Sequence, residues 1–92
     1  MNVFIGVGKI CDVNINGKRL KFNLAVKQEK PCSVPCVLFD PDDDAKKSME
    51  QFEKSNKLVW LHGKAMSYEY DFQGRTVRKF EIVTYANSIK PV

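Results

Sequence analysis

The chain has 92 residues and a formal net charge of +4, with 43% hydrophobic and 28% charged residues. This is enough for one soluble globular domain with a single core, spanning residues 1–92. We find neither an apolar run long enough to span a membrane nor a signal-peptide pattern after Met1-Asn2, so we expect a cytoplasmic protein without a membrane partner.

The charge is unevenly distributed along the chain. Residues 40–55 hold six acids and three lysines, whereas the rest holds twelve bases and five acids, a net +7. A polyanion would be attracted to the rest of the chain and repelled by this segment. Lysine also keeps small proteins soluble, so net charge alone leaves both interpretations open.

The first predicted element is a long strand from Val3 to Ile15, with apolar residues at odd positions and one interruption at Lys9. Gly6 and Gly8 share the opposite face, where glycine indicates a strong bend or the close approach of another backbone. Asn16-Gly17 predicts a type I′ hairpin turn, because both central residues of that turn need positive φ. A second strand follows, with these apolar residues on one face: Leu20, Phe22, Leu24 and Val26.

The middle of the chain predicts a loop, a short strand and a helix. Two prolines indicate that residues 30–35 form a loop, and residues 36–39 read as a short apolar strand. Asp40 is the predicted helix N-cap, with Pro41 at the first helical position and acids in the first turn. The helix should end near residues 55–56. Its apolar positions, which would plug the open end of a barrel, are Ala45, Met49 and Phe52.

The last third predicts two long strands joined by a turn at Phe72-Gln73-Gly74. Val59 and Leu61 suit the interior, so Trp60 should face outward. Five antiparallel strands, a curved first strand and a helix between the third and fourth strands describe an all-β fold. We therefore predict a five-stranded OB-fold Greek-key barrel.

The sequence contains no convincing catalytic or metal-binding pattern. The odd cysteine count argues against a disulfide framework, and Cys32-x3-Cys36 with Cys11 and His62 has poor spacing for zinc. No P-loop, His-Glu-x-x-His or Gly-x-Ser-x-Gly motif occurs, and residues 42–44 fit helix capping better than catalysis. We expect reduced thiols, no metal, no cofactor and no enzymatic activity.

Taken in chain order, several segments resemble the family of bacterial single-stranded DNA-binding proteins. They are Asn2-x5-Gly8-Lys9-Ile10, Phe22–Val26, Cys36–Phe39 with the helix after it, Leu58–Ala65, Ser67-Tyr68-Glu69, Asp71, Gly74-Arg75 and Asn87-Ser88-Ile89. Three features depart from the family. The loop between the second and third strands shrinks to Gln28–Pro35, an aromatic is replaced near Ser33, and the chain stops at Val92 without an acidic tail. The resemblance implies a short member, from a mobile element or a primosomal relative, that does not recruit repair proteins through a tail.

The residues and the resemblance together predict binding of single-stranded DNA with little sequence preference, in replication, recombination or repair. RNA remains open as a ligand. Bases would stack on aromatic rings while cations contact phosphates. The ring candidates are Phe39, Trp60, Tyr68, Tyr70 and Phe72, and the phosphate candidates are Lys9, Lys21, Lys64, Arg75, Arg78 and Lys79. We assign Phe4, Phe22, Phe52 and Phe80 to the core and leave Tyr85 undecided.

Two further expectations concern partners. The resemblance implies a homodimer or homotetramer, and the edge of the first strand could pair across a two-fold axis. The alternative function is an OB-fold protein–protein interaction module, a primosome-like accessory with weak or no nucleic-acid binding. In that case the outward Trp60 and the hairpin tyrosines would bury against a partner protein.

Overall fold

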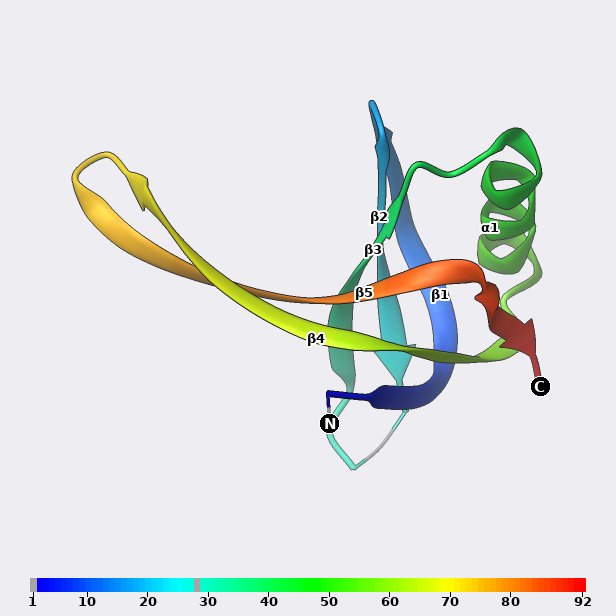
Figure 1. Cartoon of the computed structure of the whole chain (residues 1–92). Helices are drawn as coiled ribbons and strands as arrows, with labels where there is room; N and C mark the ends of the chain where they lie inside the picture. Colours follow the sequence, from blue (N-terminus) through cyan, green and yellow to red (C-terminus); the bar gives the residue numbers. More distant parts are fainter. Residues whose placement is uncertain (1, 28) are drawn as a thin grey trace.

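The computed structural model describes residues 2–27 and 29–92. Its elements are β1 (Phe4–Asn16), β2 (Arg19–Val26), β3 (Cys32–Phe39), α1 (Asp43–Ser55), β4 (Leu58–Phe72) and β5 (Arg75–Pro91). The strands close into a barrel in the order β1-β2-β3-β5-β4, shown in Figure 1. β3 and β5 run parallel, and the other neighbouring pairs are antiparallel. This topology, with the helix between β3 and β4, confirms the predicted OB-fold.

Two predicted features, the Met1 start and the first residue of the Gln28–Pro35 loop, lie outside the described residues. Within those residues, no helix has both the length and the apolar character needed to span a membrane.

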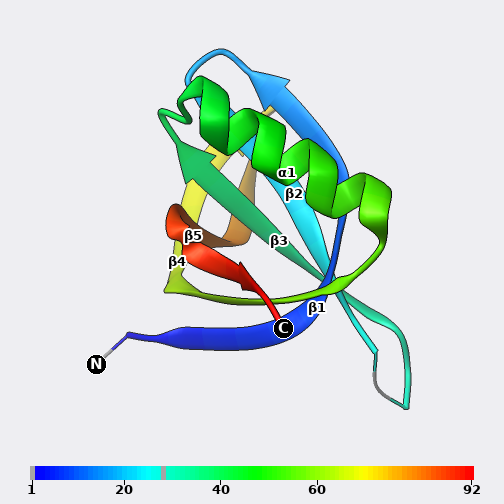
Figure 2. The same ribbon diagram turned by 90° about the vertical axis from the view of Figure 1, so that its right-hand side faces the viewer.

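The barrel interior is filled by alternate residues of its strands. Leu20, Phe22 and Leu24 of β2 are each at most 2% exposed, as the alternation predicted. α1 covers one end of the barrel, as Figure 2 shows. Its Met49 is buried and Phe52 packs against the core cluster, so the predicted plug is confirmed.

The helix begins later than predicted. Asp42 is the N-cap, and its Oδ1 accepts a hydrogen bond from the backbone amide of Ala45 at 2.7 Å. The assignment of Asp40 as N-cap was wrong, because its amide instead donates to the carbonyl of Lys18 at 2.7 Å. That bond ties the end of β3 to the β1–β2 turn before the helix can start. The predicted end is confirmed, with Asn56 in the left-handed conformation after Ser55.

β1 bends tightly against its neighbours. A Cβ on Gly8 would lie 2.4 Å from the carbonyl oxygen of Ala25, which confirms the predicted close backbone approach. Farther along, Asp12 has a φ of 56°, and the register with β2 shifts between Cys11 and Asn14. Such a bulge increases the local twist and lets one long strand serve both sides of the barrel.

The β1–β2 turn differs from the prediction by one residue. Asn16 pairs with Arg19, so the turn residues are Gly17 and Lys18. Of these, Gly17 has a positive φ of 62°. This fits a turn with glycine at its first central position rather than the predicted type I′ turn over Asn16-Gly17.

β3 is longer than predicted and includes a proline. It begins at Cys32, and Pro35 pairs with Asn23 of β2. The predicted loop over residues 30–35 was therefore wrong for most of its length. β5 pairs with β3 only from Cys36 to Leu38, so Pro35 lies where β3 is an edge strand, a position that tolerates the missing amide hydrogen.

The distal parts of β4 and β5 leave the barrel as a two-stranded ribbon, seen at the left of Figure 1. The two strands pair continuously from Gly63 with Thr84 to Phe72 with Arg75. Gln73 and Gly74 both have positive φ, 50° and 75°, which confirms the predicted glycine turn.

Candidate nucleic-acid interface

One outer surface of the sheet runs across β2, β3, β5 and β4. Residues paired between neighbouring strands project to the same face. The pairs here are Arg19 with Phe39, Lys21 with Val37, Val37 with Val83, and Val83 with Lys64. Members of the core cluster alternate with them along each strand, so this set lies on the other side of the sheet. On that side Arg19 and Lys64 are exposed, whereas Val37 and Val83 between them are buried.

The same surface continues onto one face of the ribbon. Tyr68 pairs with Lys79, Tyr70 with Val77, and Phe72 with Arg75, in phase with Lys64. We call the whole surface the aromatic-basic face; its members are Arg19, Lys21, Phe39, Lys64, Tyr68, Tyr70, Phe72, Arg75 and Lys79.

The aromatic rings of the ribbon lie close together and are largely exposed. Tyr68 and Tyr70 have ring centroids 6.5 Å apart with an interplanar angle of 39°. Tyr70 is 43% and Phe72 58% exposed, while Tyr68 is half-buried. The three rings share one face of the ribbon, as their spacing of two residues along a strand dictates. Flat exposed rings beside mobile cations are what unpaired nucleic acid requires of a protein surface.

The opposite face of the ribbon has different chemistry. It carries Ser67, Glu69, Asp71, Thr76, Arg78 and Phe80, paired across the two strands. Arg78 Nη2 donates to Glu69 Oε1 at 2.6 Å, so this candidate phosphate contact lies away from the other candidates on the ribbon and is already paired.

Phe80 is 49% exposed, so its assignment to the core was wrong. Its neighbour Ile82 reaches the barrel interior, but Phe80 lies on the ribbon, which has no enclosed interior to fill.

At the barrel end of the aromatic-basic face, Phe39 is 41% exposed and the Arg19 guanidinium lies 5.3 Å from its ring centroid. Tyr85, 56% exposed, follows Thr84 where the β3–β5 pairing ends, just as Phe39 follows Leu38. Sequence reasoning omitted Arg19 and left Tyr85 undecided. The alternation of Arg19 with Lys21 along one strand was the signal that could have placed Arg19 on this face.

Where the barrel meets the ribbon, two lysines from different strands come together. Lys21 and Lys79 line one cavity of about 230 Å³ together with the buried Glu81. Interaction with the Lys79 side chain lowers the pKa of Lys21, and the same interaction raises the pKa of Lys79. Glu81 Oε1 accepts a hydrogen bond from the Tyr68 hydroxyl at 3.2 Å.

Two of the predicted site residues lie elsewhere on the barrel. Trp60 faces outward, as predicted, but it pairs with Val7 of β1 and stacks on His62 with centroids 5.9 Å apart. Lys9 pairs with Leu58 and lines a separate cavity of about 500 Å³. Both therefore lie on the β1 side, whereas the aromatic-basic face centres on β3 and β5.

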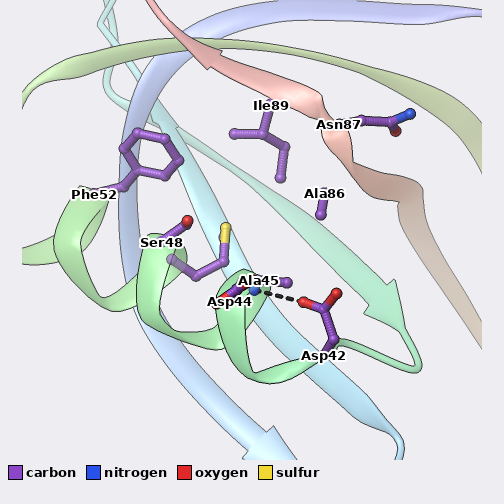
Figure 3. Close-up of a pocket in the computed structure, with 9 residues that line it drawn as sticks. Asp42, Asp44, Ala45, Ser48, Phe52, Ala86, Asn87 and Ile89 are labelled. Carbon is purple, nitrogen blue, oxygen red and sulfur yellow. Dashed lines mark hydrogen bonds between the residues drawn. The ribbon is translucent and has the colours of Figure 1, made fainter.

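The acidic helix lies far from the ribbon in Figure 1. A cavity of about 310 Å³ separates α1 from the end of β5, with Phe52 and Ile89 among its apolar lining, as Figure 3 shows. The Asp42 carboxylate at its edge is engaged in capping the helix, and Asp44 adds a second negative charge. A polyanion is disfavoured there.

The thiols show no sign of a metal centre. Cys32 is exposed, Cys36 is buried, and burial raises the pKa of Cys36 to about 12. Across residues 2–27 and 29–92, no group of three or more His, Cys, Asp or Glu side chains is placed to hold a metal ion.

Comparison with known proteins gives a structural likeness without a sequence relative. No protein-family model matches the chain, and no curated protein shows significant sequence similarity to it. The Plasmodium falciparum SSB in complex with ssDNA is similar with a TM-score of 0.72 and 14% identity, over 100% of this chain and 95% of that chain.

Two further solved structures are similar at the same level of identity. The Saccharomyces cerevisiae mitochondrial single-stranded DNA-binding protein Rim1 has a TM-score of 0.66 and 14% identity, over 98% of this chain and 93% of that chain. OBody AM3L09 bound to hen egg-white lysozyme has a TM-score of 0.65 and 14% identity, over 98% and 80%. At this identity the likenesses establish the fold that the chain shares with them.

Proposed function

We propose that this chain binds single-stranded DNA with little sequence preference, through base stacking and phosphate contacts, in cytoplasmic replication, recombination or repair. The observation that carries the proposal is that exposed rings and cations lie on one side of the sheet, from Phe39 on the barrel to Phe72 at the ribbon tip.

Stacking supplies the first part of the affinity. Each base that stacks on an aromatic side chain contributes about 1–3 kcal/mol, and every base offers a flat surface. Tyr70 and Phe72 are exposed rings two positions apart, so successive bases can use them. Such contacts accept any base and explain a low sequence preference.

Phosphate neutralisation supplies the second part. Lys64, Lys79 and Arg75 follow the same face as the rings. Each neutralised phosphate releases counterions, so binding weakens as salt increases. The concentration of the acids on α1, at the far side from the ribbon, directs a polyanion towards this face.

The structural neighbours support the proposal without deciding it. The Plasmodium protein is an SSB in complex with ssDNA, and the yeast protein is a mitochondrial single-stranded DNA-binding protein. The OBody structure is bound to a protein, so the same fold also serves protein recognition. The interaction module therefore stays as the second candidate, favoured by the exposed apolar residues of β1.

Titration of a fluorescently labelled oligothymidine, followed by anisotropy at two salt concentrations, separates the two candidates. We expect saturable binding that weakens with salt, with similar affinities for oligothymidine and oligocytidine. An oligouridine arm compares RNA with DNA. Absence of binding at low salt contradicts the proposal and favours a protein partner.

We also propose that the chain forms a homodimer or homotetramer through β1. Its first half, Phe4–Gly8, pairs with β4, while pairing with β2 starts only at Lys9. Ile5 is 71% and Val7 48% exposed on the outer side of this segment. Pairing of this edge with a second copy would continue the sheet and cover these side chains.

Light scattering coupled to size-exclusion chromatography tests the oligomer. The Ile5→Glu substitution places a charge in the interface, so the oligomer should dissociate. The control is Val92→Glu, at an apolar residue that is 76% exposed near the C-terminus. A monomeric native chain, or an equal effect of both substitutions, contradicts the proposal.

A further inference from the structure

The cavity between the barrel and the ribbon has the features of a discrete anion site. It is lined by residues of β1, β2, β3 and β5, and its polar lining residues are Lys21, Lys79, Asn14, Asn23, Asp12 and Glu81. Its volume of about 230 Å³ is several times the roughly 30 Å³ that one water occupies in the liquid. A phosphate group of five heavy atoms fits such a space with accompanying water.

The two lysine side chains line one cavity and interact with each other, and neither forms an ion pair with the Asp12 or Glu81 carboxylate beside them. Among the residues that the structure describes, the only ion pair within 4.0 Å joins Arg78 to Glu69, so neither lysine has a carboxylate at that distance. Two like charges at close range are unfavourable, and an anion between them would convert repulsion into two attractions.

Both carboxylates of the cavity accept hydrogen bonds from side chains other than the two lysines. Glu81 Oε1 accepts from the Tyr68 hydroxyl, and Asp12 Oδ2 accepts from Asn23 Nδ2 at 3.0 Å. Arg19, on the same strand as Lys21, adds a third positive charge close enough to affect the pKa of Lys21. The surroundings are thus two carboxylates and three cations, a local excess of one positive charge.

We propose that Lys21 and Lys79 together bind one phosphate group in this cavity. The inference rests on the proposed function in that the phosphate is supplied by the bound strand, and it goes further by assigning two cations to a single phosphate. Lys79 pairs directly with Tyr68 and lies diagonally from Tyr70, so the nucleotide held here is next to those stacked on the ribbon.

The salt dependence of binding distinguishes one phosphate shared by both lysines from two separate phosphate contacts. For single strands the slope of log affinity against log salt changes by about 0.7 for each neutralised phosphate. If the two lysines share one phosphate, the variant with both Lys21→Gln and Lys79→Gln loses about 0.7 of slope. Two independent contacts would instead cost about 1.4. Lys54→Gln, on the helix, is the control and should leave the slope unchanged.

A second experiment uses inorganic phosphate without DNA. Amide chemical shifts of Phe22 and Glu81, beside the cavity, are followed during phosphate titration at constant ionic strength maintained with chloride. We expect saturable shifts that vanish in Lys21→Gln and in Lys79→Gln but persist in Lys54→Gln.

The outcomes separate this inference from the proposed function. Phosphate shifts without oligothymidine binding would support the anion site and overturn strand binding. Oligothymidine binding without phosphate shifts, together with a slope loss of about 1.4, would overturn the shared site and leave strand binding intact.

Discussion

The two faces of the β4–β5 ribbon have the same backbone and opposite chemistry. One carries Tyr68, Tyr70 and Phe72 opposite Lys79, Val77 and Arg75; the other carries Ser67, Glu69 and Asp71 opposite Phe80, Arg78 and Thr76. Over these positions the first face holds two cations and no acid, whereas the second holds two acids and one cation. The next acid on the first face, Glu81, is buried. Since residues alternate between faces with a period of two, the sequence encodes this separation directly.

The comparison shows why exposure alone does not define a binding surface. Phe80 is 49% exposed and Tyr70 43%, yet Phe80 lies beside an Arg78 that Glu69 already neutralises. A ring contributes to strand binding when free cations lie beside it to hold the phosphates. The opposite face of the ribbon therefore provides matched controls for the ring and cation contacts proposed on the ribbon itself.

The largest expected effect comes from removing a ring. Tyr70→Ala should lower the affinity for oligothymidine by about 5- to 150-fold, the equivalent of 1–3 kcal/mol of stacking. Phe72→Ala should act in the same direction. Phe80→Ala is the matched control and should change the affinity by less than about twofold. Equal losses from Tyr70→Ala and Phe80→Ala, measured by anisotropy, would erase the distinction between the faces.

A smaller effect is expected from the cations of the two faces. Arg75→Gln removes a phosphate contact, so the slope of log affinity against log salt should fall by about 0.7. Arg78→Gln removes the partner of Glu69 on the other face and should leave the slope unchanged. If Arg78→Gln reduced the salt slope more than Arg75→Gln did, the strand would lie on the opposite face of the ribbon, which contradicts this account.

The next effect concerns pH at the base of the aromatic-basic face. The Lys79 side chain lowers the pKa of Lys21, whereas a bound phosphate favours the charged ammonium. Strand affinity should therefore be constant below the lowered pKa of Lys21 and fall as pH rises through that pKa. An unperturbed lysine, with a pKa of about 10.4, would produce the same fall at higher pH.

Lys21→Arg is the control for this pH dependence, because arginine stays charged throughout the range. Anisotropy titrations in steps of pH from neutral to alkaline should show a flatter profile for Lys21→Arg than for the native chain. Coincident profiles would remove Lys21 from the phosphate contact.

The smallest expected effect on binding separates Tyr68 from Tyr70. Tyr68→Phe keeps the ring but removes the hydroxyl that donates to Glu81, a residue only 5% exposed. The free energy of unfolding should fall by about 1–2 kcal/mol, because a buried carboxylate loses a hydrogen bond. Affinity should stay within about twofold. Denaturant unfolding and anisotropy measure the two quantities, and the reverse pattern would mean that the hydroxyl serves the strand.

Local alternation was enough to predict most of the barrel. Leu20, Phe22 and Leu24 on one side of β2, the outward Trp60, and the shared face of the three ribbon rings all follow from the period of two. The order of the elements then selects the OB-fold, because few closed barrels place a helix between the third and fourth strands.

The errors arose where a tertiary contact decided between local alternatives. Asp40 and Asp42 are both competent N-caps, and the bond from the Asp40 amide to Lys18 settles the choice. Pro35 predicts a loop because proline is excluded from central strands. The structure accommodates it in a strand because β5 does not pair with β3 at that residue. Phe80 alternates in sequence with polar residues as a core residue would. The sequence does not show where β5 leaves the barrel, so it does not show that Phe80 lies on the ribbon.

The pairing of distant cations was also beyond sequence reasoning. Lys21 and Lys79 were both identified as phosphate candidates, but 58 positions separate them and only the closed barrel brings them to one cavity. Lys9, Trp60 and Arg78 show the converse: their residue types suit the function, while the fold directs them to other surfaces. Whether these three contact nucleic acid stays a prediction.

Chemical-shift mapping with unlabelled oligothymidine tests the central claim most directly, since it reports every backbone amide in one titration. We expect the largest shifts at Phe39, Lys21, Tyr70 and Phe72, with small shifts at Phe80, Arg78 and throughout α1. Shifts concentrated on α1 or on the Phe80 side of the ribbon, or none at low salt, would contradict the account.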